Sequence, residues 1–201
     1  MCLSFGAQYQ LTVNDMRNLK YRILTIPVGI FTQLFKLPVT TNEFPFFDYQ
    51  YSTITFFGYY YVEAFVCGLF VLNPICIIIF FIKGLKNVVK EKEAYKLTSI
   101  IILVSVLICV VNIVLAGTLQ RYSMDYAWLL NIASFLIVFM IANNLNSLCI
   151  KKYLLKITLT LTLYMFFINF IVGAVVSESN FLERLYPNEY YAIRYSICFW
   201  E

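Results

Sequence analysis

The stretch LTSIIILVSVLICVVNIVLAGT, from Leu97 to Thr118, decides the fold class of this chain. It contains no charged residue, and as a helix rising about 1.5 Å per residue it is long enough to cross the roughly 30 Å hydrocarbon core of a bilayer. Three further stretches are equally apolar and lack Lys and Arg; they run from Tyr60 to Ile82, from Ala127 to Leu148 and from Ile157 to Val176. The sequence therefore predicts an all-α integral membrane protein with about four transmembrane helices.

The composition of the 201-residue chain agrees with a membrane protein and excludes several functions. Hydrophobic residues make up 61% of the chain and charged residues 13%, whereas soluble domains carry about 25% charged residues. Histidine is absent, which removes the commonest general base and most zinc sites. The six cysteines form no CxxC pair, and the net charge of +4 is spread over short loops. We therefore expect no metal site, no cofactor and no nucleic-acid partner.

Lysines in the loops predict the orientation. One loop carries Lys83, Lys86, Lys90, Lys92 and Lys96, and a second carries Lys151, Lys152 and Lys156, whereas the loop on the opposite side has Arg121 alone. Because short cytoplasmic loops are enriched in Lys and Arg, we expect both lysine loops in the cytoplasm. Both chain termini are then extracytoplasmic in a multi-pass protein of the cell membrane.

The two ends of the chain are expected to lie on the outer membrane surface. Residues 1–55 form an aromatic-rich segment in which Tyr21 to Leu37 is too short to span and predicts an interfacial or re-entrant helix. Residues 56–178 form the transmembrane domain, and Asn73-Pro74 is expected to kink its first helix. Residues 179–201 predict an amphipathic tail.

The N-terminal tail is hard to export as it stands. It has no signal-peptide pattern, and it carries four basic residues, which are Arg17, Lys20, Arg22 and Lys36. A preceding membrane span would explain its export. We therefore expect the chain to be the C-terminal part of a larger membrane protein, or a shortened gene product.

The strongest candidate site is the stretch from Gln120 to Tyr126. Arg121 and Asp125 are four residues apart and can pair on a helix, and an Arg at the membrane surface can bind a phosphate through two hydrogen bonds. In the simpler interpretation, Asp125 caps the third helix and Arg121 anchors it among headgroups. Tyr122 lies between them.

Two other groups of polar residues offer alternatives. The carboxylates Glu43, Asp48 and Glu63 lie near aromatic residues, as sugar chemistry would need, although solvated charges beside an aromatic belt give the same pattern. Asparagines within the spans can line a polar pathway or form interhelical hydrogen bonds; they are Asn112, Asn131, Asn143, Asn144, Asn146 and Asn169.

Several short motifs resemble a known family. NEFPFF at 42–47, RYSMDY at 121–126 and LYPNEYYAIRYSICFWE at the C-terminus resemble the C-terminal half of large bacterial polytopic membrane proteins that look like GT-C class glycosyltransferases using lipid-linked sugars. The resemblance implies that Arg121, Tyr122 and Asp125 match the family's Arg, Tyr and Asp before an apolar helix. In that class the catalytic acidic residue lies in the first extracytoplasmic loop, upstream of the part that this chain resembles.

Three functions follow from these patterns. The first is the membrane portion of a GT-C-like glycosyltransferase that uses a polyprenyl-phosphate sugar and is inactive alone. The second is a non-enzymatic small membrane subunit or scaffold that packs against a larger membrane protein. A transporter or channel is the third. The sequence leaves enzymatic activity undecided.

Overall fold

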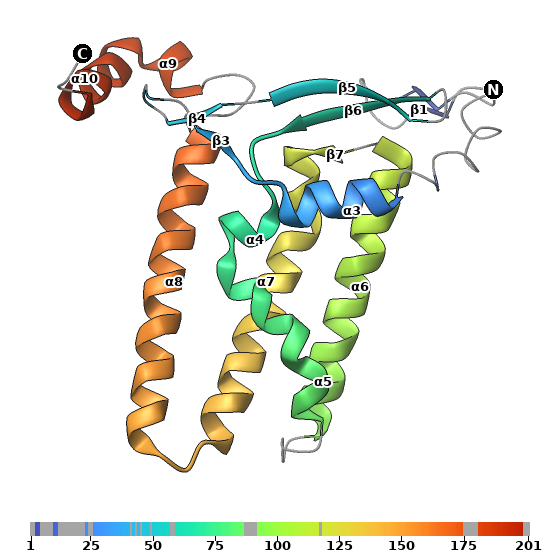
Figure 1. The fold of residues 1–201 in the computed structure, drawn as a ribbon, viewed down its shortest axis with the longest axis vertical. Coiled ribbons are helices and arrows are strands. Elements are labelled where there is room, and N and C mark those ends of the chain that lie inside the picture. The colour runs from blue at the N-terminus through green and yellow to red at the C-terminus, as the bar shows by residue number, and fades with distance from the viewer. Residues whose placement is uncertain are drawn as a thin grey trace.

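Three long helices dominate the computed structural model of the chain (Figure 1). They are α6 (Lys92–Ala116), α7 (Gln120–Asn144) and α8 (Leu148–Ala174). Each is long and apolar enough to cross a membrane, so three of the predicted spans are confirmed as helices of spanning length. The structure describes residues 3–4, 10–11, 23, 26–40, 42, 44, 46–48, 50–56, 59–86, 92–116, 118–174 and 181–198.

The predicted continuous helix over residues 60–82 is wrong. Its first part is a strand, β6 (Tyr59–Phe65), and three short helical pieces follow, which are α4 (Leu69–Leu72), the 3-10 helix η2 (Pro74–Phe81) and α5 (Ile82–Leu85). Proline at 74 has no N–H to donate, and the preceding Asn73 adopts φ −131° and ψ 71°, outside the α region. The expected kink is therefore a complete break between α4 and η2.

The segment predicted to be interfacial or re-entrant contains helix α3 (Ile26–Phe35), with Pro27 in its first turn where proline is tolerated. In Figure 1, α3 lies across the same end of α6 and α7, almost at right angles to them. Gly68 fixes the end of α3, because its amide N–H donates to the carbonyl oxygen of Lys36 at 2.7 Å. A Cβ at Gly68 would lie only 2.6 Å from the carbonyl carbon of Leu34.

Strands in the aromatic-rich region correct the all-α prediction. β5 (Gln50–Phe56) and β6 form an antiparallel hairpin, and β7 (Thr118–Leu119) pairs in parallel with β6. The aromatic and β-branched residues of this region favour strand over helix. Two smaller antiparallel pairs join β1 (Leu3–Ser4) to β2 (Gln10–Leu11) and β3 (Val39–Thr40) to β4 (Phe47–Asp48).

The C-terminal tail forms two short helices, α9 (Phe181–Leu185) and α10 (Pro187–Ile197). Tyr190 is buried and packs its ring on Phe44 with the centroids 5.6 Å apart. The hydroxyl of Tyr191 donates to Glu183 at 3.0 Å, which raises the pKa of Tyr191.

Strands β1, β5 and β6 and helices α3, α9 and α10 lie at one end of the three long helices, which we name the terminal end (Figure 1). Helix α5 and the turn between α7 and α8 lie at the other end, which we name the lysine end because of the seven described lysines there. These are Lys83, Lys86, Lys92, Lys96, Lys151, Lys152 and Lys156.

Candidate functional site

The predicted site at Arg121, Tyr122 and Asp125 lies in the first two turns of α7, at the terminal end. Asp125 is exposed and accepts a hydrogen bond from Asn112 Nδ2 of α6 at 3.0 Å, and the same amide reaches the carbonyl oxygen of Tyr122 at 3.3 Å. The side chain of Arg121 lies outside what the structure describes. Asp125 thus joins α7 to α6, whereas its pairing with Arg121 stays a prediction.

The expected capping role of Asp125 is wrong, because α7 begins five residues earlier, at Gln120. The first turn is organised by Gln120 and Ser123 instead. Ser123 Oγ donates to the carbonyl oxygen of Gln120 at 2.6 Å. Gln120 Oε1 accepts from the backbone N–H groups of Val66 at 3.0 Å and Cys67 at 3.4 Å. The side chain of Gln120 therefore holds the chain that leads from β6 into α4.

The structure does not show the outer carboxylates, the second predicted group, lying together among the residues that it describes. Glu43 lies outside the described residues. The backbone of Asp48 is in β4 and that of Glu63 is in β6, and these strands belong to different sheets. The side chains of both also lie outside what the structure describes. A role of these residues in sugar chemistry stays a prediction.

Asparagines of the long helices bind the broken segment formed by α4, η2 and α5. Asn169 Nδ2 of α8 donates to Asn73 Oδ1 at 2.9 Å and to the carbonyl oxygen of Leu72 at 3.3 Å. On α7, Asn131 Oδ1 accepts from the Cys76 thiol at 3.1 Å. A break in a helix leaves backbone groups without their usual partners, and neighbouring side chains can satisfy them. These asparagines therefore act as interhelical hydrogen-bonding residues, the simpler of the two interpretations.

Of the remaining span asparagines, Asn112 joins α6 to Asp125 of α7, whereas the other three make no interhelical hydrogen bond among the described residues. Asn144 Nδ2 donates to the carbonyl oxygen of Met140 in its own helix at 2.8 Å, and Asn143 and Asn146 are exposed. These contacts give the transporter hypothesis no support.

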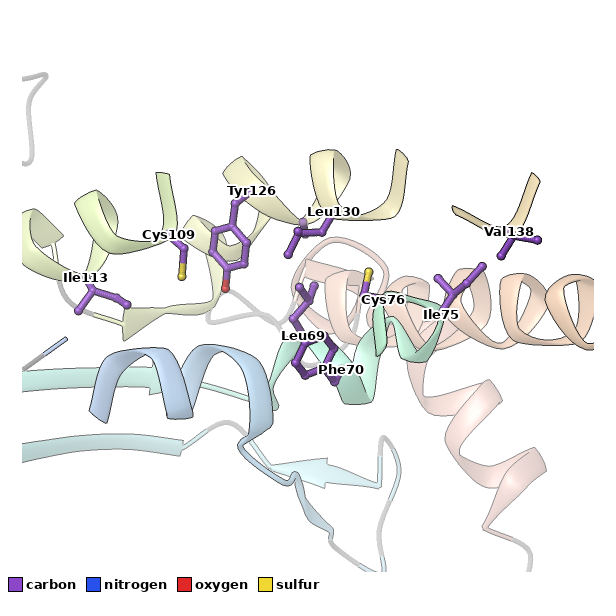
Figure 2. Close-up of a cluster of buried hydrophobic side chains, with 10 residues drawn as sticks. Leu69, Phe70, Ile75, Cys76, Cys109, Ile113, Tyr126, Leu130 and Val138 are labelled. Carbon is purple, nitrogen blue, oxygen red and sulfur yellow. The ribbon is translucent and has the colours of Figure 1, made fainter. Parts of the chain in front are cut away.

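An apolar pocket that the sequence did not predict lies between α3, α4, η2, α6 and α7, with a volume of about 200 Å³. Its inner wall contains Ser105, Cys109, Tyr126 and Leu130, all buried. Figure 2 shows Tyr126 projecting from α7 beside Cys109 of α6, with Leu69 and Phe70 of α4 nearby. Among the described residues, no group of three His, Cys, Asp or Glu side chains could hold a metal ion.

The sequence gives no role to Gln33 of α3, and it places Tyr126 at the end of the candidate stretch from Gln120 to Tyr126 without a role of its own. Gln33 is fully buried, and its Oε1 accepts from the Cys109 thiol at 3.1 Å. A single glutamine within the apolar run IPVGIFTQLF was the available signal, because a polar residue in such a run is often buried for a reason.

No protein-family model matches the chain, and comparisons with curated proteins and with solved structures gave no match.

Proposed function

We propose that the chain crosses the membrane four times, and that the broken segment Leu69–Leu85 makes the crossing that precedes α6. A 3-10 helix rises about 2.0 Å per residue and an α-helix about 1.5 Å. Laid end to end along one line, the three pieces of the broken segment would span about 28 Å, close to the roughly 30 Å of the hydrocarbon core. Interfacial positions for α3 and for α9–α10 belong to the same proposal.

In this proposal the lysine end faces the cytoplasm and the terminal end faces outward. Support comes from the seven described lysines: Lys83 lies in α5, Lys86 follows α5 directly, and the others lie in the first three turns of α6 and α8. Because Lys and Arg are retained on the cytoplasmic side, this orientation follows from charge. Both chain ends are then extracytoplasmic in the cell membrane.

We further propose that the terminal end contributes a lipid-phosphate surface to a GT-C-like glycosyltransferase acting on a polyprenyl-phosphate sugar. The observation that carries this proposal is the direction of α7. Of the three long helices, it alone begins at the terminal end (Figure 1), with Arg121 in its first turn. A helix N-terminus favours an anion, and an Arg adds hydrogen bonds to phosphate. The catalytic acid would come from another part of the enzyme.

Binding of polyprenyl phosphate tests this function. Purified chain in lipid nanodiscs is titrated with polyprenyl phosphate and with the polyprenol of the same length. We expect the phosphate to bind more tightly, and Arg121→Gln to weaken its binding about tenfold, as for loss of a charged hydrogen bond. Lys152→Gln at the lysine end serves as the control and should change nothing. Equal binding of the two lipids would contradict the proposal.

Helix α8 favours the second candidate, a non-enzymatic subunit or scaffold. Most of α8 is exposed, and its surface includes Phe166, Phe167 and Phe170. Such a face can pack against a larger membrane protein, since close packing drives helix association in lipid. Co-purification with a larger partner that is lost in Phe166→Ala/Phe170→Ala would favour this candidate over phosphate binding.

A further inference from the structure

Part of the lining of the apolar pocket is exposed on the outer surface of the helices. Phe80 of η2 and Val106 of α6 line it and are 60% and 46% exposed. Behind them the wall is largely aliphatic, with the buried Leu130 and the partly buried Ile79 and Ile102. Helix α3, which lies at the terminal end (Figure 1), contributes Ile30 and Leu34 to the lining. A molecule dissolved in the bilayer can therefore enter between Phe80 and Val106.

The inner part of the pocket ends beside one polar group, the hydroxyl of Tyr126. Tyr126 lines the pocket and is 0% exposed, and its hydroxyl has no nitrogen or oxygen partner within the described part of the chain. The Cys109 thiol, drawn beside Tyr126 in Figure 2, offers it only a weak sulfur acceptor. A buried donor thus lines a largely apolar space, where a weak or unmade hydrogen bond is costly.

The size and chemistry of the pocket restrict the ligand. Its volume of about 200 Å³ exceeds the roughly 150 Å³ of cavities that hold benzene, so a length of hydrocarbon chain fits. No charged side chain is among its lining residues, which argues against a charged phosphate headgroup inside it. The ligand needs an apolar chain and one uncharged acceptor oxygen.

We propose that this pocket binds an acyl chain of an ester-linked membrane lipid, with the ester carbonyl oxygen accepting a hydrogen bond from the Tyr126 hydroxyl. Tyr126 lies four residues after Tyr122, where the spanning part of α7 begins, or about 6 Å along the helix. Tyr126 therefore lies near the outer boundary of the hydrocarbon core, within reach of the level at which lipid ester groups lie. The proposal needs the helices to be embedded in a membrane, and it does not depend on phosphate binding at Arg121.

Native mass spectrometry of the purified chain tests the proposal with two synthetic phosphatidylglycerols. They carry identical chains, joined by ester bonds in one and by ether bonds in the other. We expect the wild type to retain the ester lipid about fivefold more tightly, the effect of one neutral hydrogen bond. Tyr126→Phe should bind both lipids equally, and Arg121→Gln should keep the preference, which separates this site from the proposed phosphate surface.

Blocking the entrance gives a second, independent readout. Val106→Trp should fill the mouth and abolish retention of the ester lipid. Leu107→Trp, on the neighbouring exposed position of α6 outside the pocket, is the matched control and should retain it. Equal retention of ester and ether lipids by the wild type would overturn the proposal, and so would unchanged retention by a folded Val106→Trp. If Val106→Trp does not fold, the Tyr126→Phe comparison decides alone.

Discussion

Helices α7 and α8 are alike in length and have the same mean hydropathy, yet they are packed very differently. They contain 25 and 27 residues. Within their spanning parts, 44% of α7 is buried in the protein and only 6% of α8. Hydropathy therefore identifies a helix that can cross the membrane, but it does not reveal which helices form the centre of the protein.

Small side chains explain the difference. On α7, Ala127, Ala133 and Ser134 are buried and let η2 and α6 approach closely. On α8, Thr158 and Thr162 turn their hydroxyls to carbonyl oxygens of their own helix at 2.9 and 2.8 Å, and bulky aromatic residues fill much of the remaining surface. The centre of the protein is thus α7 with the broken segment and α6, while α8 is held mainly at a few points.

The largest effect on the free energy of unfolding should come from adding a side chain at Gly68, where the end of α3 packs against the glycine backbone. In Gly68→Ala the new Cβ would meet backbone atoms of Leu34 and Lys36 at 2.6 to 2.7 Å, and backbone cannot yield as a side chain can. We expect a loss of about 3 kcal/mol, measured by unfolding in mixed micelles. Gly173→Ala in α8 has open space and should change the free energy of unfolding by less than about 0.5 kcal/mol.

Enlarging the buried face of α7 should have the next largest effect. Ala133 is fully buried, so Ala133→Leu should destabilise the protein by about 2 kcal/mol through overpacking. Thr160→Leu at an exposed position of α8 is the matched change and should be neutral in the same assay. If both changes cost the same, the contrast between α7 and α8 fails.

Removing the attachment of α8 at the helix break should have a smaller effect on the free energy of unfolding. Asn169→Leu removes the donor for Asn73 Oδ1 and the carbonyl oxygen of Leu72, and we expect a loss of about 1 kcal/mol, as for other interhelical hydrogen bonds in membranes. The control is Asn143→Leu, at an exposed position of α7, which should be neutral. A neutral Asn169→Leu would mean that α8 is attached by other contacts.

The smallest effect should be a gain in stability. Tyr126→Phe removes a buried hydroxyl that has no partner among the described residues, so we expect stability in lipid-free detergent to rise by about 0.5 kcal/mol. Thermal unfolding monitored by far-UV circular dichroism gives the measurement. A clear loss would show that the hydroxyl has a partner and would weaken the proposed lipid site.

Hydropathy predicted the three long helices because uninterrupted apolar runs without Lys and Arg leave few alternatives in a bilayer. Hydropathy failed over residues 60–82. Tyr59–Phe65 there is an apolar stretch, but it is rich in aromatic residues and forms a strand that pairs with β5. The sequence showed Asn73-Pro74, but this pair of residues is compatible with a kinked helix and with a full break between two helices.

The site was less predictable because its contacts join distant parts of the chain. Gln120 binds Val66 across 54 residues, and Gln33 meets Cys109 across 76. No local pattern carries that information. The capping role of Asp125 was misassigned for a related reason, since the apolar run marks where a helix becomes buried and not where it begins, at Gln120.

Cysteine labelling across the broken segment tests the four-crossing topology most directly. Asn42 at the terminal end and Lys86 at the lysine end are both exposed and flank that segment. Each is changed to Cys in a background with Cys2→Ser and Cys149→Ser, so that the other described cysteines are buried, and cells are treated with a membrane-impermeant maleimide. We predict that Asn42→Cys reacts in intact cells and that Lys86→Cys reacts only after the cells are opened. Reaction of both in intact cells, or of neither, would contradict the crossing.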